Sequence, residues 1–160
     1  MSLLMSEQEV FSMAMEVEKS GKAFYTTMVN TAPDESSREL FDFLAAEEQR
    51  HYDYFNSLSK QTGNLIIQTD DWEDISEYIK ATTDSRFFIG EDKAIRAARD
   101  AGGVLEAINI AISFEKDTLL FFYELLNVTP EGSKTAAQAI VDEEKRHILL
   151  LTEKRKELKS

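Results

Sequence analysis

The chain has 160 residues, 42% of them hydrophobic, with few Gly and Pro, a composition typical of one globular domain with a hydrophobic core. Its 30 acidic residues against 18 basic ones give a formal net charge of -12, which repels nucleic acid phosphates and anionic lipids. The absence of cysteine excludes disulfides, iron–sulfur clusters and thiol nucleophiles, so any metal must be held by Glu, Asp and His.

Two kinds of segment are missing from the sequence. No apolar run approaches the roughly 20 residues that a membrane-spanning helix needs. Residues 1–10 lack the basic start and the apolar middle of a secretion signal. We therefore expect a cytoplasmic protein whose partners are neither nucleic acid nor membrane.

Four long segments carry apolar residues at alternating steps of three and four, the period of helices that pack into a bundle. They predict helices at about 6–30, 35–60, 103–127 and 131–158. Short loops around Pro33 and Pro130 join the first helix to the second and the third to the fourth, so each pair should form an antiparallel hairpin. We therefore predict an all-α fold, a four-helix bundle in a single domain that spans the chain.

Residues 61–102 connect the two hairpins. This crossover is long enough to run the length of the bundle, as an up-down-down-up arrangement requires. Within it, 70–81 and 91–101 should form short helices. Its large aromatic residues are expected to cover the bundle and to bind nothing: Trp72, Phe87 and Phe88.

The second hairpin repeats the first in sequence. An offset of 97 residues, which falls to 96 after the proline, aligns the following pairs: Glu18 with Glu115, Tyr25 with Phe122, Pro33 with Pro130, Glu48 with Glu144, and His51 with His147. The repeat predicts two hairpins that place equivalent side chains at equivalent heights.

Each predicted helix interrupts its buried stripe with one acid, and two of the acids are followed by His three residues later: Glu18, Glu48 with His51, Glu115, and Glu144 with His147. An unpaired buried carboxylate costs several kcal/mol, and four that face one another would also repel. The basic residues lie mostly off the stripes, so two divalent cations are the expected counter-charge. Their 4+ would balance the four carboxylates, with both histidines in the neutral form that ligates metal.

The Glu-x-x-His spacing places both side chains on one helix face, so each pair can bind one ion while its carboxylate bridges to the other. Glu48 and Glu144 are therefore the expected bridging ligands, and the other two acids would cap or bridge. This oxygen-rich set with two nitrogens suits iron or manganese. The alternative is a hydrogen-bonded polar layer without metal. With 19 Glu among 160 residues, both histidines would follow Glu at this spacing by chance roughly once in seventy sequences.

Further polar residues lie beside the predicted ligands. Glu47 and Glu143 precede the two Glu ligands of the Glu-x-x-His helices and should be surface groups or hydrogen-bond partners of the ligands. Tyr25 and Tyr123 lie about two turns beyond Glu18 and Glu115, where they would pack in the core or hydrogen-bond to a ligating carboxylate.

Four segments carry a resemblance to a known family: EVEKSGKAFY, AAEEQRHYDYF, ISFEKDTLLFFYEL and VDEEKRHILLL. Two one-Glu helices and two Glu-x-x-His helices are the arrangement of ferritin-like di-iron carboxylate proteins. More narrowly, the segments resemble the ferritin-like domain of the rubrerythrin family over all but the middle of the crossover. The resemblance implies a ferritin-like bundle with a di-iron centre. It implies that the six acids and histidines are the iron ligands, and that Tyr25 and Tyr123 hydrogen-bond to them.

The chain departs from this family at two points. Rubrerythrins usually carry a rubredoxin domain whose four Cys hold an electron-transfer iron, and this sequence has no Cys, so an external donor protein would supply electrons. The family also has an extra Glu, used in peroxide reduction, three residues after the ligand on the third helix. Here that residue is Thr118, which leaves a site closer to the six-ligand ferritin-like centre.

The expected function is that of a di-iron oxidoreductase in which Fe(II) is oxidised by H₂O₂ or O₂. Alternatives are iron binding or storage without turnover, a substrate-oxidising di-iron oxygenase, and a metal-free helical interaction module. An oxygenase would need an organic pocket beside the metals. The resemblance also makes a homodimer an expectation.

Overall fold

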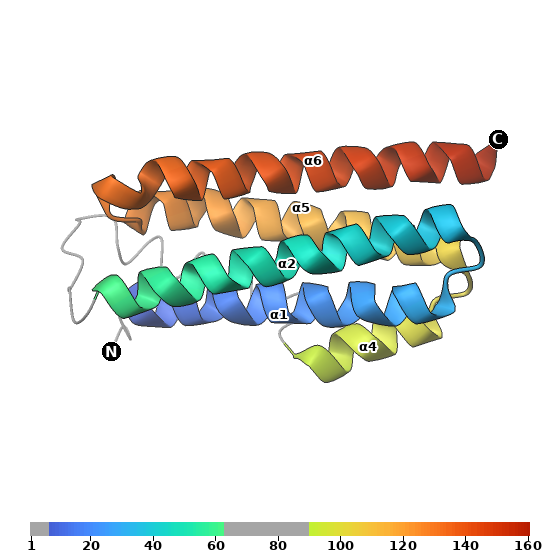
Figure 1. Cartoon of the computed structure of the whole chain (residues 1–160), viewed down its shortest axis with the longest axis horizontal. Helices are drawn as coiled ribbons and strands as arrows, with labels where there is room; N and C mark the ends of the chain where they lie inside the picture. The colour runs from blue at the N-terminus through green and yellow to red at the C-terminus, as the bar shows by residue number, and fades with distance from the viewer. Residues whose placement is uncertain (1–6, 63–89) are drawn as a thin grey trace.

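The computed structural model describes residues 7–62 and 90–160 (Figure 1). The helices in that part of the chain are α1 (Glu7–Thr31), α2 (Glu35–Thr62), α4 (Glu91–Asp100), α5 (Val104–Val128) and α6 (Lys134–Lys159), with a 3-10 turn at Glu131–Ser133. The long helices begin and end within two residues of the predicted bounds, except that the fourth begins as the 3-10 turn. The helix predicted at 70–81 and the three crossover aromatic residues lie outside the described residues.

The long helices form two antiparallel hairpins, because α1 packs along α2 and α5 along α6. In Figure 1, α1 and α6 run in one direction and α2 and α5 in the other, which is the predicted up-down-down-up order. The predicted crossover helix is α4, which packs along the outside of α1. No described helix is long and apolar enough to cross a membrane.

Short-range contacts fix where the helices begin. Asp34 caps α2, since its Oδ1 accepts a hydrogen bond of 2.8 Å from the Ser37 amide, and this bond lowers the pKa of Asp34. Gly90 has a φ of 134°, a conformation that side chains disfavour, at the residue before α4. Its amide donates to Ser20 Oγ on α1 over 3.1 Å, which ties the start of α4 to the bundle.

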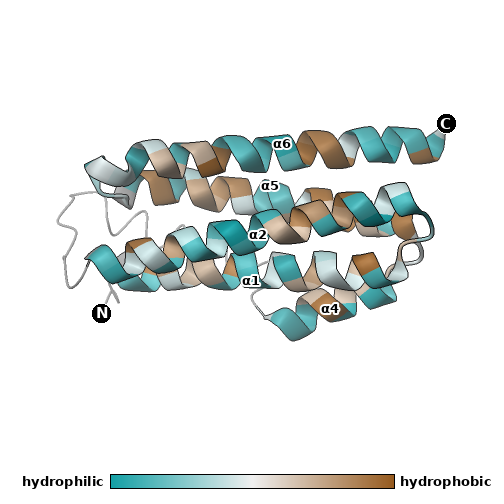
Figure 2. Ribbon diagram, viewed as in Figure 1, coloured by the Kyte–Doolittle hydropathy of each residue, from teal (hydrophilic) through white to brown (hydrophobic). Residues whose placement is uncertain are grey.

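The core consists of apolar side chains above and below a buried polar level. Hydrophobic and hydrophilic residues alternate along every long helix (Figure 2). Tyr25 stacks on Phe41 at one side of the polar level, with ring centroids 6.4 Å apart, and Phe55 packs on Phe122 at the other, 5.2 Å apart. These aromatic pairs shield the middle of the bundle from water at both ends.

Candidate metal centre

The polar level in the middle of the bundle is formed by the six residues that the sequence singled out. Each lies at 0% exposure: Glu18 from α1, Glu48 and His51 from α2, Glu115 from α5, and Glu144 and His147 from α6. All four long helices therefore direct a carboxylate inward, and the two histidine rings stack with centroids 5.7 Å apart. The sequence repeat therefore places equivalent side chains of the two hairpins at the same level of the bundle, as its spacing predicted.

These side chains form two overlapping groups whose possible ligand atoms lie within 4.8 Å of one another. One group is Glu18, His51 and Glu144, and the other is Glu48, Glu115, Glu144 and His147. A metal bound at about 2.0–2.2 Å from each ligand would separate opposite ligand atoms by about 4 Å, so both groups have the right size. Glu144 belongs to both groups and is placed to bridge. Glu48, also expected to bridge, belongs to one.

Most of these ligand atoms have no hydrogen-bond partner. Glu18, Glu48 and Glu144 have both carboxylate oxygens buried and unpartnered. Among the described residues, every buried side-chain nitrogen or oxygen in this condition belongs to the six residues, apart from Thr118 Oγ1. Native proteins leave few such atoms unpaired because each costs about 1–3 kcal/mol. Buried oxygen and nitrogen atoms that converge without hydrogen bonds fit a site that holds cations.

Burial and mutual repulsion shift the pKa values of the carboxyl groups. Burial raises the pKa of Glu18 well above its usual value, and the charge of Glu144 raises it further. Burial and then the charge of Glu18 do the same for Glu48. Burial raises the pKa of Glu115 to about 7, helped by Glu144. Without metal, these three side chains therefore retain protons well above pH 4.5.

Glu144 is the exception among the four acids. Burial acts to raise its pKa most strongly, but the favourable interaction with the nearby imidazolium groups of His147 and His51 prevails and lowers it. The histidine pKa values move up, against the effect of burial. Glu144 stabilises the imidazolium form of His51 and raises its pKa to about 9, and Glu115 and Glu144 raise that of His147 to about 11. Without metal, two protonated histidines supply the positive charge, and metal binding must displace those protons.

Both histidines direct Nδ1 inward. His51 Nδ1 lies 2.8 Å from Glu144 Oε1, and His147 Nδ1 lies 3.3 Å from Glu144 Oε2. The Nε2 atoms face outward, where His51 Nε2 lies 2.8 Å from Glu143 Oε2 and His147 Nε2 lies 3.9 Å from Glu47 Oε2. With the proton on Nε2, Nδ1 is free to ligate, so the outer carboxylates favour the ligating tautomer.

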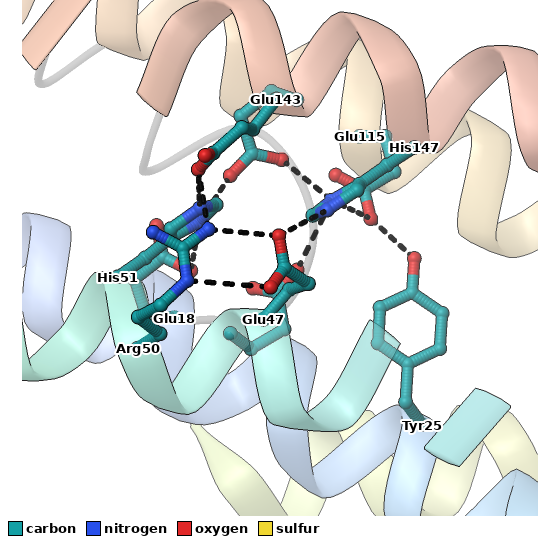
Figure 3. A network of polar contacts seen from close by, with 10 residues as sticks. Glu18, Tyr25, Glu47, Arg50, His51, Glu115, Glu143 and His147 are labelled. Atoms are coloured by element: carbon teal, nitrogen blue, oxygen red, sulfur yellow. Dashed lines mark hydrogen bonds and ion pairs between the residues drawn. The ribbon is translucent and has the colours of Figure 1, made fainter. Parts of the chain in front are cut away.

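Arg50 closes this outer face of the centre. Its Nη2 donates to Glu47 over 2.8 Å on its own helix and to Glu143 over 2.6 Å on α6 (Figure 3). One guanidinium thus joins α2 to α6 across the histidine pair. Although burial acts to raise the pKa of Glu143, the hydrogen bond from Arg50 lowers it on balance, so this carboxylate stays ionised beside His51. Glu47 and Glu143 were predicted to be surface groups or hydrogen-bond partners of the ligands, and Glu143 is such a partner because it lies 2.8 Å from His51 Nε2.

The structure separates the two tyrosines that the resemblance paired. The Tyr25 hydroxyl donates to Glu115 Oε1 inside the bundle (Figure 3). Tyr123 is 41% exposed and lies beneath Lys145, whose Nζ is 5.4 Å from the ring centroid. The expectation that Tyr123 hydrogen-bonds to a ligand is wrong, because it lies eight residues after Glu115, about 80° round the helix, whereas Phe122 is the repeat partner of Tyr25.

Two features beside the centre escaped the sequence analysis. A Cβ on Gly21 would lie 2.6 Å from Glu48 Oε2 and 2.9 Å from the Phe114 ring, so a side chain at this position would force these groups to shift. A cavity of about 320 Å³ lies between α1, α2 and α4 and reaches Glu18 and Glu48, the two acids of the first hairpin. Its other lining residues are Lys19, Lys22, Ala23, Thr26, Thr27, Gln49, Tyr52, Glu91 and Ile95. A glycine in the buried stripe of α1 could have indicated the close approach of Glu48. Nothing in the sequence indicates the cavity, because the period of a helix does not determine the distance between helices.

Comparisons with known proteins agree with this geometry. No curated protein matches the chain. A solved structure of a protein described as a ferritin-like diiron-carboxylate protein, from Thermotoga maritima, matches with a TM-score of 0.73, 23% identity and coverage of 96% of each chain. This similarity shows that the bundle is ferritin-like, as predicted. Residues 9–154 match the profile of the family described as Rubrerythrin, and the chain therefore belongs to the rubrerythrin family.

Proposed function

We propose that this chain is a di-iron oxidoreductase that oxidises Fe(II) with H₂O₂ or O₂ and receives electrons from a separate donor protein. The observation that carries the proposal is the set of buried, unpartnered ligand atoms shared among all four helices. Family membership supports iron. The ligand chemistry fits manganese as well, so metal analysis has to identify the native ion.

The two overlapping groups support a proposed assignment of the ligands. Glu18 and His51 would hold one ion, and Glu48, Glu115 and His147 the other, with Glu144 between them. Two ferrous ions held by these residues would supply the two electrons that, with two protons, reduce one H₂O₂ to two waters, and the external donor would return those electrons. Four carboxylates balance the 4+ of two ferrous ions, so reduction of the pair leaves the buried centre near neutrality.

The remaining residues of the centre would hold the ligands in place and exclude water. Glu143 accepts the outward proton of His51, and Arg50 holds Glu143 in that position. Tyr25 donates to Glu115, which fixes one carboxylate oxygen and leaves Oε2 for metal. Such partners of ligands affect metal affinity about 10- to 100-fold in other proteins.

Anaerobic loading with Fe(II), followed by separate additions of H₂O₂ and O₂, tests the proposal. We expect ferric absorption with a consumption of one H₂O₂ for two Fe(II). The control variant Glu131→Gln, at an exposed side chain, should behave as the wild type. Two bound irons that neither oxidant changes would contradict the proposal and favour non-catalytic iron binding. Many irons per chain would favour storage.

The cavity favours a second candidate, a substrate-oxidising oxygenase. Its volume of about 320 Å³ is at the lower limit for small-molecule sites, and Glu18 and Glu48 are among its lining residues. An oxygenase supplied with ¹⁸O₂, an electron donor and phenol would place one ¹⁸O atom in the organic product and the other in water. The peroxidase or ferroxidase would leave phenol unlabelled.

A further inference from the structure

Thr118 is a buried side chain whose hydroxyl bonds to nothing in the described part of the chain. It lies on α5 at 3% exposure, and Oγ1 has no hydrogen-bond partner. In the described residues it is the one buried unpartnered side-chain atom outside the six predicted ligands. A hydroxyl in this condition costs free energy unless something not yet bound pairs with it.

Other hydroxyls on these helices are satisfied by their own backbone. Ser20 donates to the carbonyl of Glu16 over 2.7 Å, and Thr129 donates to that of Leu125 over 2.8 Å, each four residues back along the chain. A helical threonine can always reach this carbonyl by rotation about χ1. Thr118 makes no such bond, so its hydroxyl is available to a partner outside its own helix.

The position of Thr118 is next to the candidate centre. It follows Glu115 by three residues, which places both side chains on one face of α5. Its partner in the sequence repeat is Gly21, three residues after Glu18, where a Cβ would lie 2.6 Å from Glu48 Oε2. The equivalent position on α1 therefore borders the carboxylates directly. At this position of the repeat, the first hairpin has Gly21, which has no side chain, and the second has the hydroxyl of Thr118.

We propose that the Thr118 hydroxyl donates a hydrogen bond to a small anion or water molecule that enters the metal centre beside Glu115. The inference rests on the proposed di-iron function and names a residue that positions the incoming ligand. Four carboxylates and two imidazoles leave coordination positions open on two ions that favour six ligands each. Phe114, Phe121 and Phe122 are buried and lie three or four residues from Thr118, on the same side of α5, which favours a small ligand.

A neutral hydroxyl suits this task better than an acid. It donates without adding negative charge to a centre whose four carboxylates already balance two divalent ions. It accepts as well as donates, so it can pair with water or with an anion. Thr118 therefore orients the ligand without competing to bind the ions.

Cobalt and azide test the inference without requiring redox turnover. The full chain is loaded with Co(II), cobalt content is measured, and azide is titrated while the visible cobalt absorption is recorded. Thr118→Val, which keeps the shape and removes the hydroxyl, should bind azide about 3- to 10-fold more weakly with unchanged cobalt content. Thr129→Val makes the same chemical change at a hydroxyl bonded to its own helix and should bind azide as the wild type does.

A second pair of variants covers a failure of Thr118→Val to fold. Thr118→Ser keeps the hydroxyl and Thr118→Ala removes it, so azide affinity should be retained in the first and reduced in the second. Equal azide affinity with and without the hydroxyl, or loss of cobalt from the valine or alanine variant, would overturn the inference while leaving the di-iron proposal intact. A wild-type chain that binds no cobalt and no iron would overturn both.

Discussion

The two hairpins repeat their ligands but differ in the residues around them. Both contribute a Glu from one helix and a Glu-x-x-His pair from the other, all fully buried. Beside these ligands, Tyr25 of the first hairpin corresponds to Phe122 of the second, and Gly21 corresponds to Thr118. The helix α4 and the cavity border the first hairpin. Charge balance requires both hairpins to supply the same ligands. The residues beside the ligands are not constrained in this way, and their differences give the two sides of the centre different surroundings.

Protonation differs between the hairpins in the same way. In the first, burial raises the pKa values of both acids, Glu18 and Glu48. In the second, the interaction with the two nearby histidines outweighs burial and lowers the pKa of Glu144. Without metal, the second hairpin therefore carries the ionised carboxylate to which both imidazolium groups bind.

The largest effect should come from removing that carboxylate. In the metal-free protein at pH 7, Glu144→Gln should lower the free energy of unfolding by about 3–5 kcal/mol, because it leaves two buried cations without their shared partner. Glu48→Gln imitates the neutral acid already present and should change stability far less. Urea unfolding of chelator-treated protein gives both values. Equal losses in the two variants would refute the protonation difference.

Stability against pH extends the same comparison. Glu18, Glu48 and Glu115 bind protons more tightly when folded, and so do His51 and His147, so the folded chain holds more protons than the unfolded one above pH 4.5. The free energy of unfolding of metal-free protein should therefore fall as pH rises from about 4.5 through 7 to about 9, the range set by Glu115 and His51.

Metal should reverse this trend, because ligands bind ions in their deprotonated forms and affinity rises with pH. Thermal unfolding at pH 5, 7 and 9, with chelator and with saturating metal, measures both slopes. Chelator-treated protein that gains stability between pH 5 and 9 would show that the folded chain holds fewer protons than the unfolded one in this range, which contradicts the raised pKa values.

Gly21→Ala tests the tighter packing of the first hairpin. The added Cβ would lie 2.6 Å from Glu48 Oε2 and 2.9 Å from the Phe114 ring, which should cost about 1–3 kcal/mol of stability and weaken metal binding. Gly132→Ala is the matched control, since a Cβ there meets nothing within 4 Å. Urea unfolding and metal titration should separate the two variants. If Gly21→Ala is as stable as the control and binds metal normally, the Glu48 carboxylate does not pack closely against Gly21.

The outer carboxylates should also be unequal. Glu143 Oε2 lies 2.8 Å from His51 Nε2, whereas Glu47 Oε2 lies 3.9 Å from His147 Nε2. Glu143→Gln should weaken metal binding about 10- to 100-fold, and Glu47→Gln should have the smaller effect. Competition with a chelator of known affinity measures both. The reverse order would mean that Arg50 and not the histidine contact decides the role of these acids.

The smallest effect is expected from Tyr25→Phe, which gives the first hairpin the residue that the second has at this position. Loss of the hydrogen bond to Glu115 should weaken metal binding about 3- to 10-fold. Tyr123→Phe provides the control, because that side chain is 41% exposed and away from the centre. If metal titration shows an equal loss of affinity in both variants, the conclusion that only Tyr25 supports the centre is contradicted.

The four helices and their inward acids could be predicted because helix period determines which face each residue occupies. An acid in an apolar stripe, such as Glu115 between Ile112 and Leu119, has to lie where its stripe lies. The repeat then placed four such acids at one level. These inferences need only the spacing of residues along each helix.

Contacts across helices were harder to predict, because they depend on rotamers and on inter-helix distance. The adjacent tyrosine and phenylalanine at 123 and 122 differ by about 100° in direction, enough to exchange an exposed role for a buried one. Arg50 lies off the stripe, yet its long side chain reaches Glu143 on another helix. The cavity beside α4 follows from how that helix sits on α1, which spacing does not encode.

Metal content measured together with stability tests the central claim most directly. Protein isolated without chelator, or loaded anaerobically with Fe(II), should contain two ions per chain, and their removal should lower the melting temperature at pH 7. A chain that takes up no ion under any loading condition, and that unfolds at the same temperature with and without chelator, would show that these buried acids need no cations.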